Sequence, residues 1–212
     1  MKRIRLFPAL SACSISLLVC SGCSGLFSSP EYHETAVYDL GFPEVLEKLP
    51  FPLTVRAFSS DTSARYKMLF RNGEQLVPDE FARWCRCPSD MLTRYCRIAL
   101  SESTARTSSE SLAAREFVLS GTVLAFESDM NDKVCRLYVK CALSDAENES
   151  RVLWAKTYFT TAPAVFSPDD PGKGAAVAMR QAAETFIRDL SRDLVSLKGL
   201  TQTEGTEPRA GK

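Results

Sequence analysis

The N-terminal 22 residues constrain this chain most, because they follow the pattern of a secretory leader. Lys2, Arg3 and Arg5 are their only charged residues, and a largely apolar run of about 14 residues follows from Leu6 to Val19. A helix that crosses the hydrocarbon core of a membrane needs about 20 apolar residues, and this run is interrupted by proline and serine. We therefore predict a leader that is removed, and not a transmembrane anchor.

The leader ends on a sequence typical of bacterial lipoproteins. Ser21-Gly22-Cys23 resembles the last three positions of a lipobox, although Cys20 stands where leucine or valine is usual. We predict a lipoprotein signal peptide over 1–22 and lipid attachment at Cys23, with an ordinary cleaved signal peptide as the alternative. The residue after the cysteine is Ser24 and not aspartate, which resembles the outer-membrane sorting signal of enterobacterial lipoproteins. More than one acyl chain on the cysteine is enough for stable anchoring.

Composition divides the rest of the chain into three segments. Residues 23–34 are mostly small or polar and are interrupted by proline, so we expect a lipidated tether. Residues 200–212 contain glycine and proline with little to bury, so we expect a disordered C-terminal tail. The folded domain then occupies 35–199, which is long enough to bury a core of adequate size.

Charge excludes two classes of partner. The whole chain has 26 basic and 26 acidic residues, and removal of the leader takes away three basic residues and no acidic one, which leaves a net charge of −3. Anionic surfaces repel a domain of this charge. We therefore expect no nucleic-acid partner, and no attachment to the membrane other than through the lipid anchor.

The pattern of apolar residues predicts a sheet covered by helices. The first half of the folded region has three β-prone runs and then two helical segments, and the second half has an antiparallel meander and then one long helix. This order predicts an α/β fold with a mixed, largely antiparallel sheet. The expected strands are 36–40, 53–58, 65–71, 117–127, 134–143 and 151–160, and the expected helices are 79–85 after Pro78, 89–103 capped by Ser89, and 174–198.

Three of these segments have a face that we expect to be buried. Every second residue of 134–143 is apolar, as in a strand with one face on the core. The two longer helices have apolar residues three and four positions apart. The expected buried residues are Cys135, Leu137, Val139, Cys141 and Leu143 on the strand, Leu92, Cys96, Ala99 and Leu100 on the first helix, and Met179, Ala183, Phe186, Ile187, Leu190, Leu194 and Leu197 on the last.

The groups that catalysis most often needs are missing or badly placed, so we predict no enzymatic activity, no catalytic residues and no cofactor. The chain's single histidine, His33, falls in the expected tether, and no G-x-S-x-G elbow is present. Pro171-Gly172-Lys173-Gly174 lacks the P-loop pattern and follows Asp169-Asp170, so we expect a structural turn and a helix start. We expect Asp169-Asp170 and the Asp129/Asp132 pair to be solvated turns.

Five cysteines remain after the leader and the lipidated residue, and we interpret all five as structural or incidental. Cys85-x-Cys87 is too tightly spaced for a zinc pair and no second pair matches, so no metal site is expected. Cys135 and Cys141 are about 20 Å apart on one strand, too far to bond to each other, and Cys96 lies on a helix stripe. The sequence leaves open a disulfide between Cys85 or Cys87 and another cysteine. Because the number of remaining cysteines is odd, at least one thiol is free or pairs with another chain.

Six segments of the folded region occur in an order known from one protein family. They are Tyr38-Asp39-Leu40-Gly41, Leu53 to Phe58, Tyr66-Lys67-Met68 with Arg71, Phe81 to Trp84 with Pro88 and Met91-Leu92, Phe117 to Glu127, and Val152-Leu153-Trp154 with Thr160-Thr161. Together they resemble the ABC-type transport auxiliary lipoprotein family, which includes the paraquat-inducible protein C type. The resemblance covers about residues 34 to 198. It departs from the family at Leu76-Val77-Pro78, where tyrosines are usual, and in the cysteine-rich segment 84–88.

This resemblance implies a non-catalytic, membrane-anchored periplasmic lipoprotein whose fold is a three-layer α/β sandwich. It implies an auxiliary role in an ABC/MCE-type system that moves lipids between the inner and outer membranes. The MCE-domain protein and the ABC permease would be the partners, and a homo-oligomer stays open. We expect the domain at the outer membrane, lipid-anchored and facing the periplasm. The alternative is an outer-membrane assembly or peptidoglycan-synthase-activating lipoprotein, since such proteins can share a tethered α/β domain.

Overall fold

The computed structural model of the 212-residue chain describes residues 34–197, except 45, 47–48, 62–64 and 102–115. From Thr35 onward the described residues belong to one compact unit, Thr35–Lys212. The predicted signal peptide, the lipid-attachment residue Cys23, His33 and the predicted C-terminal tail lie outside the described residues.

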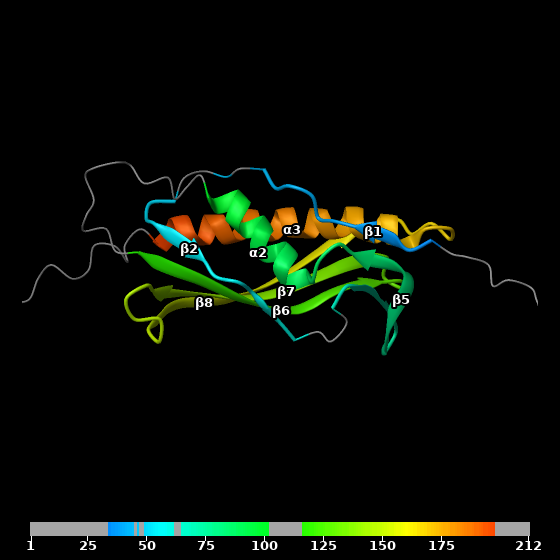
Figure 1. Cartoon of the computed structure of the whole chain (residues 1–212), viewed down its shortest axis with the longest axis horizontal. Helices are drawn as coiled ribbons and strands as arrows, with labels where there is room; N and C mark the ends of the chain where they lie inside the picture. The colour runs from blue at the N-terminus through cyan, green and yellow to red at the C-terminus, as the bar shows by residue number, and fades with distance from the viewer. Residues whose placement is uncertain (1–33, 45, 47–48, 62–64, 102–115, 198–212) are drawn as a thin grey trace, which may run out of the picture. The chain divides into compact units, whose positions relative to one another are not determined.

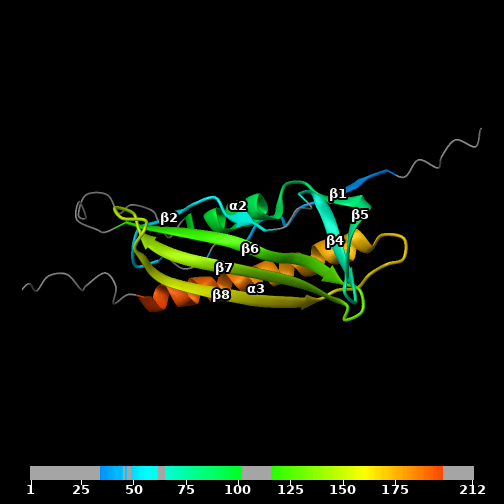
Figure 2. The ribbon, with the colours of Figure 1, turned by 90° about the horizontal axis from the view of Figure 1, so that it is seen from below.

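A mixed sheet of eight strands forms the framework of the described residues (Figure 1 and Figure 2). Six strands follow one another across it in the order β1-β5-β4-β6-β7-β8, and β2 and β3 also pair with β6. The strands are β1 (Ala36–Tyr38), β2 (Leu53–Val55), β3 (Ser59–Ser60), β4 (Lys67–Asn72), β5 (Gln75–Trp84), β6 (Phe117–Asp129), β7 (Val134–Asp145) and β8 (Val152–Pro163).

Strand β6 organises this sheet because neighbours line both of its edges. One edge carries β7 along its whole length, from the pair Phe117↔Asp145 to the pair Asp129↔Val134. The other edge is shared by β2, β3 and β4, which run parallel to β6 and pair with it one after another. Strands β6, β7 and β8 form the antiparallel meander that the sequence predicts.

Two described helices, α2 (Pro88–Ser101) and α3 (Pro171–Ser196), lie on the same face of the sheet. Figure 2 shows the sheet in front of both of them. Helix α3 packs against β1, β6, β7 and β8, and α2 packs against β2, β3, β6 and α3. Pro171 starts α3 at a position that needs no amide hydrogen. The Asp170 side chain caps the helix by accepting from the Lys173 amide at 3.0 Å.

The apolar stripes that the sequence predicts form the core between the sheet and the helices. All the residues expected to be buried are buried, apart from Leu197, which is half-buried and packs against the core. Aromatic contacts add to this packing, because the Tyr158 ring on β8 lies 5.4 Å from the Phe186 ring on α3. Burial of one such side chain stabilises a fold by about 1.5–3 kcal/mol.

The structure confirms an α/β sandwich with a mixed sheet covered by helices, in which the longest strand pairs are antiparallel. Within the described residues the sandwich consists of a sheet layer and a helix layer on one of its faces. Side chains on the other face, such as Lys140 and Phe159, are exposed. No helix in the described ranges is long and apolar enough to cross a membrane.

The helix predicted over 79–85 is wrong, because these residues form the end of β5 and the turn after it. The turn at Gly73-Glu74 returns the chain alongside β4, so hairpin pairing overrides the local helical pattern. Gly73 has a φ of +59°, which glycine adopts without steric cost. Pro78 is tolerated because β1 pairs only with Ala82 to Trp84, so a single described strand flanks β5 at the proline.

Three smaller differences concern where elements begin or end. Helix α2 starts at Pro88, so Ser89 lies inside its first turn and does not cap it. Helix α3 starts at Pro171, three residues earlier than predicted. The second predicted strand, 53–58, is shorter than predicted, because β2 ends at Val55 and the two-residue β3 begins only at Ser59. Between them the Phe58 amide donates to Thr93 Oγ1 at 2.8 Å and not to a neighbouring strand.

Candidate functional site

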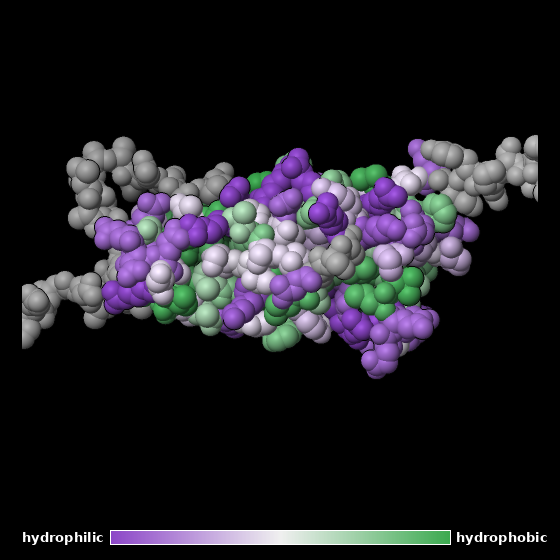
Figure 3. Space-filling view, turned by 60° about the horizontal axis from the view of Figure 1, so that its bottom comes forward, coloured by the Kyte–Doolittle hydropathy of each residue, from purple (hydrophilic) through white to green (hydrophobic). Residues whose placement is uncertain are grey.

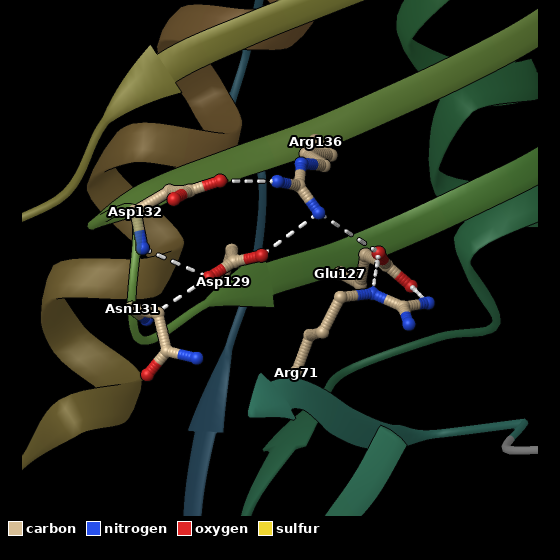
Figure 4. A network of polar contacts seen from close by, with 6 residues as sticks. All are labelled: Arg71, Glu127, Asp129, Asn131, Asp132 and Arg136. Carbon is tan, nitrogen blue, oxygen red and sulfur yellow. Dashed lines mark hydrogen bonds and ion pairs between the residues drawn. The ribbon is translucent and has the colours of Figure 1, made fainter. Parts of the chain in front are cut away.

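A set of charged side chains lies on the uncovered face of the sheet, where β4, β6 and β7 meet (Figure 4). We call it the charged cluster: Arg71 on β4, Glu127 and Asp129 on β6, Arg136 on β7, and Asp132 in the β6–β7 turn. Glu127 and Asp129 are two positions apart, so both side chains point to the same face. The β6–β7 register places Arg136 directly opposite Glu127.

Arg71 holds Glu127 with two hydrogen bonds. Arg71 Nε lies 2.6 Å from Glu127 Oε1, and Arg71 Nη2 lies 2.9 Å from Glu127 Oε2. The Glu127 side chain is 8% exposed, and a charge buried to this extent requires a partner. The hydrogen bond to Glu127 is the main cause of the raised pKa of Arg71. The pair also fixes the end of β4, where the Arg71 carbonyl accepts from the Met130 amide at 3.0 Å.

Asp129 is held by two backbone amides and one guanidinium. Its Oδ1 accepts from the amides of Asn131 and Asp132, each at 2.9 Å, and its Oδ2 lies 2.8 Å from Arg136 Nη1. The Asp132 amide is the largest of the causes that lower the pKa of Asp129, and burial works in the opposite direction. Asp129 is therefore ionised at neutral pH, and it organises the turn that leads into β7.

The prediction of a solvated Asp129/Asp132 turn is wrong for Asp129, which is 5% exposed, whereas the Asp132 side chain is open to solvent. Arg136 contacts both, at 2.8 Å and 2.6 Å, and lies 3.9 Å from Glu127. Its planar guanidinium suits such contacts because it carries five donors. Each carboxylate of the cluster is therefore paired with an arginine.

The charged cluster as a whole was not predicted from the sequence. The signal that could have found part of it is alternation along β6, because Glu127 and Asp129 lie between positions that face the core, such as Phe126 and Ser128. A tight turn after them then brings Arg136 opposite Glu127. The hairpin pattern alone could therefore have predicted that Arg136 pairs with Glu127 and Asp129.

Four members of the charged cluster, Arg71, Glu127, Asp129 and Arg136, line an open pocket of about 450 Å³. Gly73 and Glu74 of the β4–β5 hairpin and Tyr138 of β7 complete the lining. The Tyr138 ring packs edge-to-face on Phe159 at 4.9 Å, and Phe159 and Leu124 are among the exposed apolar residues of this side. Figure 3 brings this side forward and shows polar and apolar residues interspersed. The surface thus combines charged groups with aromatic rings.

The five described cysteines are all free thiols, so the bridge left open for Cys85 or Cys87 does not form within the described residues. Cys96, Cys135 and Cys141 are fully buried, which confirms them as core residues. Burial raises the pKa of Cys135 to about 11 and that of Cys141 to about 12, so both stay protonated at neutral pH. No group of three or more His, Cys, Asp or Glu in the described ranges is placed to hold a metal ion.

Asp170 is not a solvated turn residue, because it connects α3 to β1. It caps the helix and also accepts from the Tyr38 hydroxyl at 2.5 Å. Burial, followed by this hydrogen bond, raises the pKa of Tyr38 to about 12. Gly172 packs so closely that a Cβ there would lie 2.8 Å from Tyr38 and from Ala82. Asp169 is exposed. The structural helix start predicted for this segment is confirmed.

The architecture defines an α/β sandwich in which helices cover a mixed sheet, and solved structures share it. The chain is similar to a Xanthomonas campestris protein of the DUF330 family, with a TM-score of 0.60 and 21% identity over 79% of this chain and 100% of that one. A second crystal structure, of an uncharacterized protein, gives a TM-score of 0.53 and 14% identity over 74% of this chain and 99% of that one. At these identities the likeness shows the fold.

Other comparisons add little. A putative lipoprotein from Caulobacter crescentus is 15% identical over 51% of this chain and 80% of that one, but its TM-score of 0.35 is too low to support an argument. No family model matches the chain. No curated protein sequence matches it either.

Proposed function

We propose that the chain is a non-catalytic periplasmic lipoprotein, anchored in the outer membrane through Cys23, and an auxiliary component of an ABC/MCE-type lipid transport system. The observation that carries this proposal is a lipobox in front of an α/β domain with the fold of a DUF330 protein. The order of the sequence motifs, which resembles the ABC-type transport auxiliary lipoproteins, adds the assignment to transport.

The motifs behind the resemblance occupy the framework of the domain. The segment Phe117 to Glu127 is most of β6, which pairs with β2, β3, β4 and β7. Gly121 within it makes room for the Phe58 ring, because a Cβ there would lie 2.7 Å from that ring. Trp84 packs on Phe126 at 5.1 Å between ring centres. Residues that match the transport auxiliary lipoproteins are therefore needed for the packing of this domain, which supports a shared fold with that family.

A docking role is consistent with the surface opposite the helices. Its buried carboxylates, Glu127 and Asp129, are each paired with an arginine, and beside them the half-buried Tyr138 ring packs on the exposed Phe159 ring. Rigid polar groups beside exposed aromatic rings are features of protein interfaces. We assign this face as the one that meets the transport partners.

The lipid anchor would keep the domain close to those partners. The tether over 23–34 has 12 residues and spans at most about 40 Å when fully extended. A domain confined to such a layer has a high effective concentration at the membrane, so contacts of modest affinity are sufficient. Placement, and not chemistry, is then the contribution of this protein.

Affinity purification of the tagged full chain after crosslinking in its own cells tests the proposal. We expect an MCE-domain protein and an ABC permease among the captured proteins. The test variant is Phe159→Asp, which places a charge on the uncovered face without touching the core, and which we expect to reduce their capture. Capture of outer-membrane assembly proteins or of peptidoglycan synthases instead would favour the alternative class of lipoprotein and contradict the transport role.

A further inference from the structure

Strand β8 forms a border of the sheet and has a neighbour on one side only within the described residues. It has 12 residues and pairs with β7 alone, and Figure 2 shows it along one border of the sheet. A strand in this position presents amide and carbonyl groups with which another chain can pair. We propose that β8 pairs with β8 of a second copy of this chain, antiparallel and about a two-fold axis, so that two sheets become one.

The register between β7 and β8 determines which backbone groups of β8 point outward. The Ala164 amide donates to the Lys133 carbonyl at 2.8 Å, so these two opposed residues form a hydrogen-bonded pair. In an antiparallel ladder such pairs alternate with pairs that exchange no hydrogen bonds. The register continues without a shift as far as Leu143↔Trp154. The residues of β8 that direct their backbone groups away from β7 are therefore Ala155, Thr157, Phe159 and Thr161.

The edge of β8 lacks the features that usually prevent pairing with another chain. Its outward backbone groups have no partner within the described ranges. The four outward residues are uncharged, and Lys156, the single charged residue of β8, binds Asp193 of α3 at 2.6 Å. Other free edges are short or interrupted, because β1, β2 and β3 have at most three residues. The part of β5 beyond β1 contains Pro78, Asp79 and Glu80, which disfavour pairing. Among the described strands, β8 is thus the edge suited to a second chain.

One antiparallel register pairs all four outward residues of both copies. Thr157 then lies opposite Phe159 of the second copy, and Ala155 lies opposite Thr161 of the second copy. Each of these pairs exchanges two hydrogen bonds. Because both copies contribute the same residues, the interface is complementary to itself, and the assembly closes at two chains.

The side chains and charges at this edge also fit a second copy. Phe159 is 68% exposed and packs on one side against the Tyr138 ring, with 4.9 Å between the ring centres. In the proposed register Thr157 of the second copy lies on its other side, and aromatic and β-branched residues in such positions stabilise a sheet. Lys156 lies opposite Thr160 of the second copy, so no like charges face each other. Pairing therefore covers an exposed aromatic ring without electrostatic repulsion.

Sedimentation velocity of the purified full chain tests the pairing, in a detergent whose density matches that of the buffer. We expect a species with twice the protein mass of one chain. Thr157→Pro removes an outward amide that β7 does not use, and proline is tolerated at the edge of a sheet. It should raise the dissociation constant of the dimer by about 10-fold or more, because each dimer loses two hydrogen bonds. The matched control is Thr157→Val, which keeps the amide and the β-branched shape and should leave the dissociation constant unchanged.

Photocrosslinking between two differently tagged copies of the full chain identifies the neighbour of β8 in cells. A photoreactive amino acid in place of Phe159 should link the two tags, whereas the same amino acid in place of Leu124, exposed on β6, should not. This readout holds even if thermal unfolding shows that Thr157→Pro does not fold, and neither measurement depends on the transport role. A wild-type chain that sediments as a monomer, a dimer that a folded Thr157→Pro variant leaves unchanged, or crosslinks from position 159 to other proteins only would overturn the proposal.

Discussion

The Glu127 carboxylate is buried on the uncovered face of the sheet, and Arg71 meets it with two hydrogen bonds. Glu127→Gln keeps the shape but replaces a charged acceptor with a neutral amide. We predict that the free energy of unfolding falls by about 1.5–3 kcal/mol, the range for hydrogen bonds to charged groups. Urea unfolding measures this difference.

The matched control for this prediction is Glu149→Gln. Glu149 forms an ion pair with Arg56 in which both side chains are exposed. Such pairs contribute about 0–1 kcal/mol because water screens them and both side chains lose freedom. If both variants lose the same amount of stability, the burial of Glu127 is not what makes its pairing matter.

Asp129 should make stability depend on pH. Its folded-state pKa lies below the ordinary value of 3.8, so its contribution is present at higher pH and is lost as pH falls through the folded-state pKa. We predict that the wild type exceeds Asp129→Asn in free energy of unfolding at about pH 6 and that the difference shrinks below about pH 4. Unfolding curves across this range check the prediction, and a difference that stays constant down to about pH 3 would contradict it.

At the scale of elements, the close fit between β6 and the segment after β2 is a contact that a single substitution can probe. An added Cβ at Gly121 would lie 2.7 Å from the Phe58 ring, which is itself buried. We predict that Gly121→Ala destabilises the fold by about 1–3 kcal/mol, as overpacking does. Thermal unfolding against Ser120→Ala, at the neighbouring residue of β6, measures it. Equal stability of the two variants would mean that Phe58 moves aside at no cost.

Elements with one clearly buried face were predictable from sequence, whereas β5 was not. Alternation in β7 and the spacing of apolar residues in α3 reflect burial against one neighbour, so a local pattern reports it. Most of β5 has no such pattern, because its first half is exposed and its pairing comes from the hairpin with β4. The pairing of Arg71 with Glu127 was also not predictable from a local pattern. The two residues are 56 positions apart, and β4 meets β6 through a parallel pairing.

At the scale of the whole molecule, the proposed function depends on two parts of the chain. The described part of the domain from Thr35 onward presents an uncovered sheet face with a charged cluster, and the residues before it resemble a lipoprotein leader in sequence. Loss of the anchor should therefore abolish function without unfolding the domain. We predict that the Cys23→Ala chain unfolds at the same temperature as the wild type but is recovered in the soluble periplasmic fraction.

Labelling of growing cells with a fatty-acid analogue tests the lipoprotein assignment most directly. The comparison is between the wild-type chain, Cys23→Ala, and the matched control Cys20→Leu, which introduces the residue usual at that lipobox position. We predict that the wild type and Cys20→Leu are labelled and that Cys23→Ala is not. Labelling that persists in Cys23→Ala, or a wild-type chain that takes up no label, would contradict a lipid anchor at Cys23.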